Sequence, residues 1–257
     1  MGYKIVFFDV DGTITNHKDG SIPISTIEAI KTLKCRGLKV VAATGRPLSM
    51  CNELQELGIE TFITANGGYV KHIQEVIHKV PMDKRIIEEV IEFAKKENNG
   101  LSFYTEGFSM NGVTEEEILI ALKETLSLEE YPETNPLIHN EDIFLLCLFA
   151  NDASVEKYKR KFPHLTFKRW HPYVLNVLHE DVSKSLAIMK TLDFFCLDKS
   201  EAIAFGDGEN DIDMLELVGL GIAMGNGNEK LKTVADFVTK PSSEDGIDYA
   251  LKKYGII

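Results

Sequence analysis

The sequence is poor in cysteine, has a single tryptophan and contains no long hydrophobic run. None of its cysteines stands two to four residues from another, which excludes a zinc knuckle and a CxxC redox pair. We therefore expect buried, reduced thiols in a cytoplasmic protein, at Cys35, Cys51, Cys147 and Cys196. The first apolar run ends at Asp9, so it is too short and too acidic for a signal peptide or a membrane span.

Positive charge is also scarce, because 28 lysine and arginine residues stand against 40 acidic ones, giving a formal net charge of −12. This balance argues against a nucleic acid or an anionic membrane as partner, since no net attraction favours the encounter. The hydrophobic fraction of 44% is ordinary for a globular protein, and 257 residues suffice for one large or two modest domains. Nothing in the pattern indicates an oligomeric state.

Continuous apolar segments alternate with helical patterns at both ends of the chain. The expected strands lie at 4–8, 38–44, 61–65, 202–205 and 219–223. Such strands are typical of an α/β fold, a doubly wound, Rossmann-like parallel sheet with helices on both faces. The alternating stretch 67–80 predicts a hairpin at the edge of this sheet.

The middle of the chain has a different pattern, in which short strands and helices follow one another without buried parallel strands. Helices are expected at 83–97, 114–126 and 154–162, and strands at 101–106, 108–112, 143–150, 165–170 and 173–178. The sequence thus predicts a catalytic core formed by residues 1–82 and 179–257, interrupted by an inserted α+β domain at 83–178.

Polar side chains follow three of the apolar strands. They are Asp9 and Asp11 after the first strand, Thr44, Gly45 and Arg46 after the second, and Asp207, Asn210 and Asp211 after the strand at 202–205. In an open parallel sheet, ligands bind beyond the carboxyl ends of the strands. We therefore expect these residues to share one edge.

Carboxylates gathered at one place raise one another's pKa, and a divalent cation removes that cost. Oxygen ligands favour a hard ion such as Mg²⁺, which shares its coordination with water and phosphate. Lys184 follows Ser183, the expected N-cap of a helix, where a positive charge is unfavourable unless an anion binds there. Thr44 offers a hydroxyl to the same anion. Each motif alone is common in ordinary turns, but their combination at strand ends indicates a phosphate and metal site.

The motifs FFDVDGT (7–13), ATGR (43–46), SKSL (183–186) and GDGENDIDML (206–215) resemble the haloacid dehalogenase superfamily, in particular its Cof-type sugar-phosphate phosphatase branch. The insert stands where this branch carries its cap domain. Ser185 departs from the glycine that is frequent in the third motif.

The resemblance implies a role for each matching residue. Asp9 would be the nucleophile and form an aspartyl phosphate, and Asp11 would act as general acid and then base. Mg²⁺ would be held by the Asp9 carboxylate, the Asp11 main-chain carbonyl and Asp207, with Asp211 close behind. The phosphoryl group would be bound by Thr44 and Lys184, with Gly45 and Asn210 lining the pocket. The cap would close over the site and select the leaving group of a small phosphorylated substrate.

Several functions remain open at this point. A phosphotransferase or phosphomutase would use the same scaffold with an alcohol as acceptor, and a non-catalytic phospho-ligand sensor would keep the site without turnover. A receiver domain would be about half as long and would lack the insert. Dehalogenation is disfavoured, because it needs no acid at Asp11. Sugar phosphates, flavin mononucleotide and pyridoxal phosphate all remain possible substrates.

Three further segments admit two interpretations each, and a fourth is interpreted in a single way. Arg46 either contacts substrate or pairs with a surface acid, and Asn66–Gly67 is either a turn or an active-site loop. Arg169, Trp170 and His171 either line a substrate pocket or belong to a strand with Trp170 packed on the core. The segment GNGNEKL (225–231) is interpreted as a turn with a helix N-cap.

Overall fold

The structure is a computed structural model that describes residues 2–178 and 182–257. The chain divides into two compact units. The core unit comprises Met1–Gly45, Cys51–Lys79 and Ser183–Ile257, and the inserted unit comprises Arg46–Met50 and Val80–Val182. The domain boundaries inferred from the sequence stay a prediction, and residues 179–181, where the second of them falls, lie outside the described residues.

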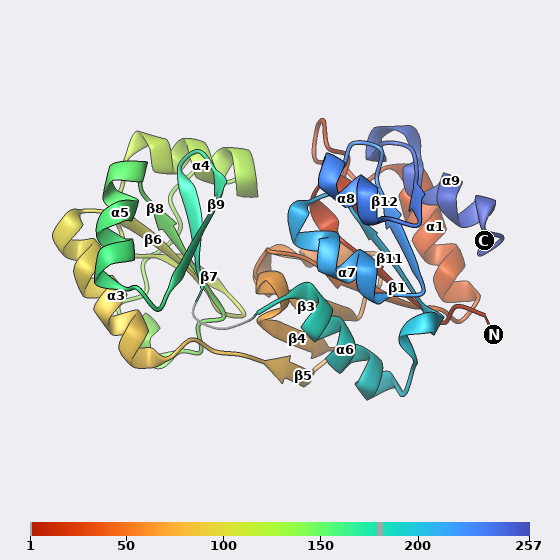
Figure 1. Cartoon of the computed structure of the whole chain (residues 1–257), viewed down its shortest axis with the longest axis horizontal. Coiled ribbons are helices and arrows are strands. Elements are labelled where there is room, and N and C mark those ends of the chain that lie inside the picture. Colours follow the sequence, from red (N-terminus) through yellow and green to blue (C-terminus); the bar gives the residue numbers. More distant parts are fainter. Residues whose placement is uncertain (1, 179–181) are drawn as a thin grey trace. The chain divides into compact units, whose positions relative to one another are not determined.

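The core unit is built on an eight-stranded sheet with the order β13-β12-β11-β1-β2-β3-β4-β5 (Figure 1). Its strands are β1 (Ile5–Phe8), β2 (Lys39–Ala43), β3 (Thr61–Thr64), β4 (Tyr69–His72), β5 (Glu75–Lys79), β11 (Ala202–Gly206), β12 (Leu220–Ala223) and β13 (Phe237–Val238). Neighbours from β13 to β3 are parallel, whereas β4 and β5 add an antiparallel hairpin at one edge. The predicted parallel sheet and its edge hairpin are therefore confirmed.

Helices cover both faces of this sheet, and the reason is visible in β1. All four of its side chains are fully buried, although successive residues point to opposite faces. Ile5 and Phe7 share a core with Ala187 and Ile188 of α6. The helices of the core unit are α1 (Ile24–Cys35), α2 (Asn52–Glu56), α6 (Lys184–Phe195), α7 (Ile212–Leu217), α8 (Glu229–Val234) and α9 (Gly246–Lys253).

The inserted unit contains a five-stranded antiparallel sheet with the order β7-β6-β8-β10-β9 (Figure 1). Its elements are α3 (Lys84–Glu97), β6 (Gly100–Tyr104), β7 (Phe108–Met110), α4 (Glu116–Leu126), β8 (Leu145–Phe149), α5 (Asp152–Lys161), β9 (Thr166–His171) and β10 (Val174–Leu178). Helices α3 and α5 pack on the face that carries Leu101, Leu148 and Val177. This α+β character agrees with the pattern read from the sequence.

The four cysteines are free, but the expectation that all are buried is wrong for two of them. Cys51 and Cys147 are buried, and burial raises the pKa of the Cys147 thiol to about 12. Cys35 is the last residue of α1 and Cys196 caps the end of α6, and both are exposed because these helix ends reach solvent. Within the described residues, no helix has the length and apolar character needed to cross a membrane.

Candidate active site

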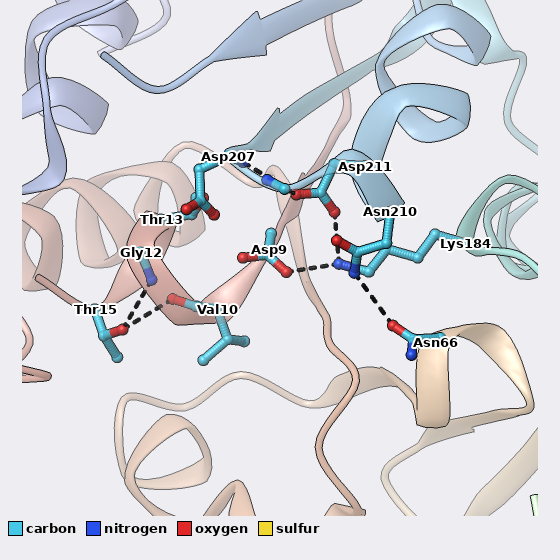
Figure 2. Close-up of polar contacts among 11 residues, drawn as sticks. Asp9, Val10, Gly12, Thr13, Thr15, Asn66, Lys184, Asp207, Asn210 and Asp211 are labelled. Carbon is cyan, nitrogen blue, oxygen red and sulfur yellow. Dashed lines mark hydrogen bonds and ion pairs between the residues drawn. The ribbon is translucent and has the colours of Figure 1, made fainter. Parts of the chain in front are cut away.

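Asp9 is the first residue after β1, and its backbone is fixed at the sheet edge. Its N–H donates a hydrogen bond to the carbonyl of Phe205 in β11, at 2.9 Å. The chain then makes a single wide turn, Val10–Ile14, in which Thr15 Oγ1 accepts from Gly12 N and donates to the Val10 carbonyl (Figure 2). The turn leaves Asp9 buried, with 7% of the residue exposed, and its carboxylate lies close to those of Asp207 and Asp211 in the loop after β11.

Gly12 is required by this turn for two reasons. Its φ of +85° lies in the left-handed region, which side chains disfavour. A Cβ at this position would also lie 2.3 Å from Oδ2 of Asp207. The loop after β1 and the loop after β11 therefore touch each other at a place where only glycine fits.

The loop after β11 is organised by the Asp211 carboxylate. Its Oδ2 accepts hydrogen bonds from the backbone N–H groups of Asp207 (3.0 Å) and Gly208 (2.9 Å). Its Oδ1 lies 2.6 Å from Nζ of Lys184. Asp211 is thus fully buried with both oxygens occupied by groups of the protein.

Lys184 begins α6, and the predicted N-cap is confirmed because Ser183 Oγ accepts from the N–H of Leu186. Its Nζ lies 2.6 Å from Oδ1 of Asp9 as well as 2.6 Å from Asp211 (Figure 2). The side chain is 1% exposed. A buried ammonium group at a helix N-terminus is stable here because two carboxylates share it.

The electrostatics of these groups show an excess of negative charge. Burial and the Asp211 carboxylate raise the pKa of Asp9 well above its ordinary value, although the Lys184 ammonium acts in the opposite direction. Burial and Asp211 also raise the pKa of Asp207, to about 6. Burial alone would lower the pKa of Lys184, but Asp211 and Asp9 outweigh it and raise that pKa above its ordinary value. The single positive charge of Lys184 therefore does not neutralise the three carboxylates of Asp9, Asp207 and Asp211.

The donor set fits a hard divalent cation. Carboxylate oxygens of Asp9, Asp207 and Asp211 lie within 4.8 Å of one another, and they are oxygen ligands of the kind that Mg²⁺ prefers. Asp9 and Asp207 are the better placed of the three, because Asp211 already binds Lys184 and two N–H groups. The side chain of Asp11 is exposed to solvent.

Three further predicted residues lie beside one another in the core unit. Thr44 is fully buried directly after β2, and its carbonyl accepts from the N–H of Asn66 at 3.0 Å. A Cβ on Gly45 would lie 3.2 Å from Oδ1 of Asn66, and the same oxygen accepts from Nδ2 of Asn210 at 3.2 Å (Figure 2).

Asn66–Gly67 is therefore a turn, and Asn66 contacts the predicted site residue Asn210, while the interpretation as an active-site loop stays a prediction. Ala65, Asn66 and Gly67 all have positive φ, of 51°, 54° and 105°. Backbone held in this region by its surroundings is typical of functional sites.

The remaining candidates belong to the inserted unit. Arg46 donates from Nη1 to the carbonyl of Met50 at 3.3 Å. Trp170 is 46% exposed and donates its indole N–H to Asn176, so the interpretation that it packs on the core is wrong. Arg169 pairs with Asp152 at 2.9 Å, and His171 contacts Glu124 at 2.9 Å.

Two residues of the site were not found from the sequence. Thr13 Oγ1 donates to Oδ1 of Asp207 at 3.1 Å, and Asn226 Nδ2 donates to the carbonyl of Gly12 at 2.9 Å. Thr13 stands inside the first motif, but the sequence does not indicate which residue its hydroxyl would contact. Asn226 lies between two glycines in the loop that follows β12, at the same edge of the sheet, and this position was the signal available in the sequence.

The profile of the haloacid dehalogenase-like hydrolases matches residues 6–251. The chain belongs to the haloacid dehalogenase-like hydrolase family. This haloacid dehalogenase-like hydrolase is 39% identical to YkrA of Bacillus subtilis, which is named as a phosphatase, over 100% of both chains. The resemblance to the haloacid dehalogenase superfamily is thus confirmed.

Two solved structures share the fold of this hydrolase. A hypothetical protein of Geobacillus kaustophilus has a TM-score of 0.92 and 38% identity, covering 100% of both chains. The subclass IIB sugar phosphatase BT4131 has a TM-score of 0.84 and 32% identity, covering 99% of this chain and 100% of its own. These findings confirm the predicted fold class and support the prediction of a phosphatase.

Proposed function

We propose that this haloacid dehalogenase-like hydrolase is a Mg²⁺-dependent phosphatase that hydrolyses small phosphorylated metabolites through an aspartyl phosphate on Asp9. The observation that carries the proposal is the Asp9 carboxylate, which is buried, lies 2.6 Å from the Lys184 ammonium and shares its surroundings with two further carboxylates. A nucleophilic carboxylate next to a fixed positive charge is what attack on a phosphate monoester requires.

Each residue of the site then has a chemical task. An Asp9 oxygen forms a bond to phosphorus while the bond from phosphorus to the alcohol oxygen breaks, and Asp11 gives its proton to the departing alcohol. Asp11 then takes a proton from water, which attacks phosphorus and releases Asp9 and inorganic phosphate. Lys184 and Thr44 bind phosphoryl oxygens, with Gly45 and Asn210 lining the same pocket.

The cation would be held by Asp9 and Asp207, together with the Asp11 main-chain carbonyl, while Asp211 supports the loop from behind. When bound, Mg²⁺ neutralises phosphoryl charge and so lets an anion approach an anion. The excess of three carboxylates, Asp9, Asp207 and Asp211, over the single ammonium group of Lys184 supports this assignment.

The substrate class is inferred from the family. The name of BT4131 states that it is a sugar phosphatase, so we propose sugar phosphates as the first class to examine. The inserted unit would select among leaving groups, with Arg46 contacting substrate. A phosphotransferase would transfer the phosphoryl group to an alcohol instead, and it would release little inorganic phosphate without an added acceptor.

The proposal is tested by measuring phosphate release from a panel of phosphorylated metabolites with Mg²⁺. We expect release from sugar phosphates that EDTA abolishes and that Asp9→Asn lacks. Asp19→Asn is a matched control, because Asp19 lies on an exposed loop and asparagine can still accept from Ser21. Full turnover by Asp9→Asn would show that another residue is the nucleophile.

A further inference from the structure

Asn226 makes three hydrogen bonds that join separate loops of the core unit. Its Nδ2 donates to the carbonyl of Gly12 at 2.9 Å and to Oδ2 of Asp207 at 3.4 Å. Its Oδ1 accepts from the N–H of Ser242 at 2.8 Å. From the loop after β12, one side chain thus reaches the loops that follow β1, β11 and β13.

The backbone around Asn226 is fixed against Asp207. The N–H of Asn228 donates to the carbonyl of Asp207 at 2.8 Å. A Cβ on Gly227 would lie 3.2 Å from Cα of Asp207, so the glycine permits this close approach. The distance between Asn226 and the Asp207 side chain is therefore set by two neighbouring residues of the same loop.

Each oxygen of the Asp207 carboxylate accepts a hydrogen bond from a side chain. Thr13 donates to Oδ1 at 3.1 Å, and Asn226 donates to Oδ2. Each carboxylate oxygen has a second lone-pair direction, so these donors fix the carboxylate while leaving it able to bind a cation. Groups that orient a metal-binding carboxylate in this way typically change metal affinity by about 10-fold to 100-fold when they are removed.

We propose that Asn226 is a positioning residue: it is anchored by its contacts with Gly12 and Ser242, and it holds the Asp207 carboxylate in the orientation that binds the divalent cation. The inference rests on the proposed function, since it assumes that Asp207 is a ligand. Only an amide fits the three contacts, because Nδ2 must donate to two oxygens while Oδ1 accepts from an N–H. A purely structural role would need only the contacts to Gly12 and Ser242.

The test compares Asn226→Ala with Asn228→Ala in the full chain. The side chain of Asn228 caps α8 by accepting a hydrogen bond from the N–H of Lys230, and it does not contribute to the hydrogen bonds that hold the Asp207 carboxylate. Its removal therefore perturbs the same loop while leaving those hydrogen bonds in place. The probe is Mn²⁺ alone, and its binding is measured from the electron paramagnetic resonance signal of the free ion. The Mg²⁺ concentration that half-activates phosphate release is measured beside it.

We expect the dissociation constant for Mn²⁺ to rise about 10-fold to 100-fold in Asn226→Ala and to stay within about twofold of wild type in Asn228→Ala. The half-activating Mg²⁺ concentration should rise with it, while kcat at saturating Mg²⁺ changes less. Thr13→Val removes the other hydrogen bond to Asp207 and should also weaken Mn²⁺ binding.

Unchanged Mn²⁺ affinity in a folded Asn226→Ala variant overturns the proposal and leaves Asn226 a structural role. If that variant does not fold, Asn226→Ser, whose shorter side chain keeps one polar group, carries the same comparison. Wild-type protein that binds Mn²⁺ but hydrolyses no phosphate ester contradicts the proposed function, whereas the affinity comparison still decides the role of Asn226.

Discussion

The ammonium nitrogen of Lys184 lies 2.6 Å from Oδ1 of Asp9, and both side chains are buried. The same nitrogen is equally close to Asp211, so neither carboxylate receives its full charge. The pair is therefore no ordinary stabilising salt bridge. It holds the Asp9 carboxylate and the Lys184 ammonium group side by side at the edge of the sheet. Burying these charges costs desolvation energy, which ligand binding can offset.

Lys184→Met should destabilise the cation-free protein by about 3–5 kcal/mol, because it leaves two buried carboxylates without their counter-charge. It should also lower phosphate release by at least about 100-fold. The free energy of unfolding from urea titration measures the first effect. Lys190→Met, an exposed position on the same helix, should change either quantity little.

Asp211→Asn in the Lys184→Met background should restore part of the lost stability, because it removes one of the uncompensated charges. It should restore no activity. Equal stability of the single and double variants would contradict the view that charge repulsion is the cause.

Asp11→Asn should lower kcat by about 100-fold to 10,000-fold while Mn²⁺ binding stays close to wild type. The reason is that Asp11 would contribute its main-chain carbonyl to the cation, and this carbonyl is unchanged in the variant. The exposed position of the side chain makes a large loss of stability unexpected. Loss of Mn²⁺ binding would show that the carboxylate itself is a ligand.

The stabilisation of the protein by Mg²⁺ should depend on pH. Asp9 and Asp207 have pKa values raised above the usual value of about 4, and that of Asp207 is about 6. A carboxyl group whose pKa is raised on folding stabilises the fold below its unfolded pKa, and this contribution is lost as the pH rises through its folded pKa. The cation-free protein therefore loses the contribution of Asp207 between about pH 4 and pH 6, and it loses that of Asp9 as the pH rises through the raised pKa of that group.

Mg²⁺ must displace the proton of Asp207 at pH 5, so its affinity there should be about tenfold weaker than above pH 7. The rise in Tm caused by Mg²⁺ should accordingly be larger at pH 7.5 than at pH 5.0. Thermal unfolding with and without Mg²⁺ at the two pH values measures this difference. An equal rise at both would show that Asp207 is ionised throughout.

The sequence predicted the part of the site that follows directly from strand ends. Apolar runs define where β1, β2 and β11 stop, and the residues after them must meet at one edge of a parallel sheet. This is why the sequence alone predicts that Asp9 and Asp207 lie close together. Lys184 begins a helix instead, and it was assigned to the site because a positive charge at a helix N-terminus is unfavourable unless an anion binds there. Their catalytic roles stay predictions.

The rest depends on contacts between loops, which local patterns do not encode. Asn226 looked like part of a turn because its partners, Gly12 and Asp207, are distant in the sequence. The exposure of Cys35 and Trp170 depends on where helix ends and strand edges meet solvent, which hydrophobicity alone does not decide.

Gly12→Ala and Gly20→Ala separate backbone strain from the contact with Asp207. Both glycines have positive φ, of 85° and 72°, so alanine should cost each about 1 kcal/mol in stability. A Cβ on Gly20 meets no atom within 4 Å, whereas one on Gly12 lies 2.3 Å from Oδ2 of Asp207.

Gly20→Ala should therefore keep wild-type Mn²⁺ affinity and activity. Gly12→Ala should lose more stability and also lose cation binding and phosphate release, because the Asp207 carboxylate has to move away from the position where Thr13 and Asn226 hold it. Urea unfolding and Mn²⁺ titration of the two variants measure these effects. Wild-type Mn²⁺ affinity in Gly12→Ala would mean that the cation does not depend on the position of the Asp207 carboxylate, and Asp207 could then no longer be assigned as a ligand.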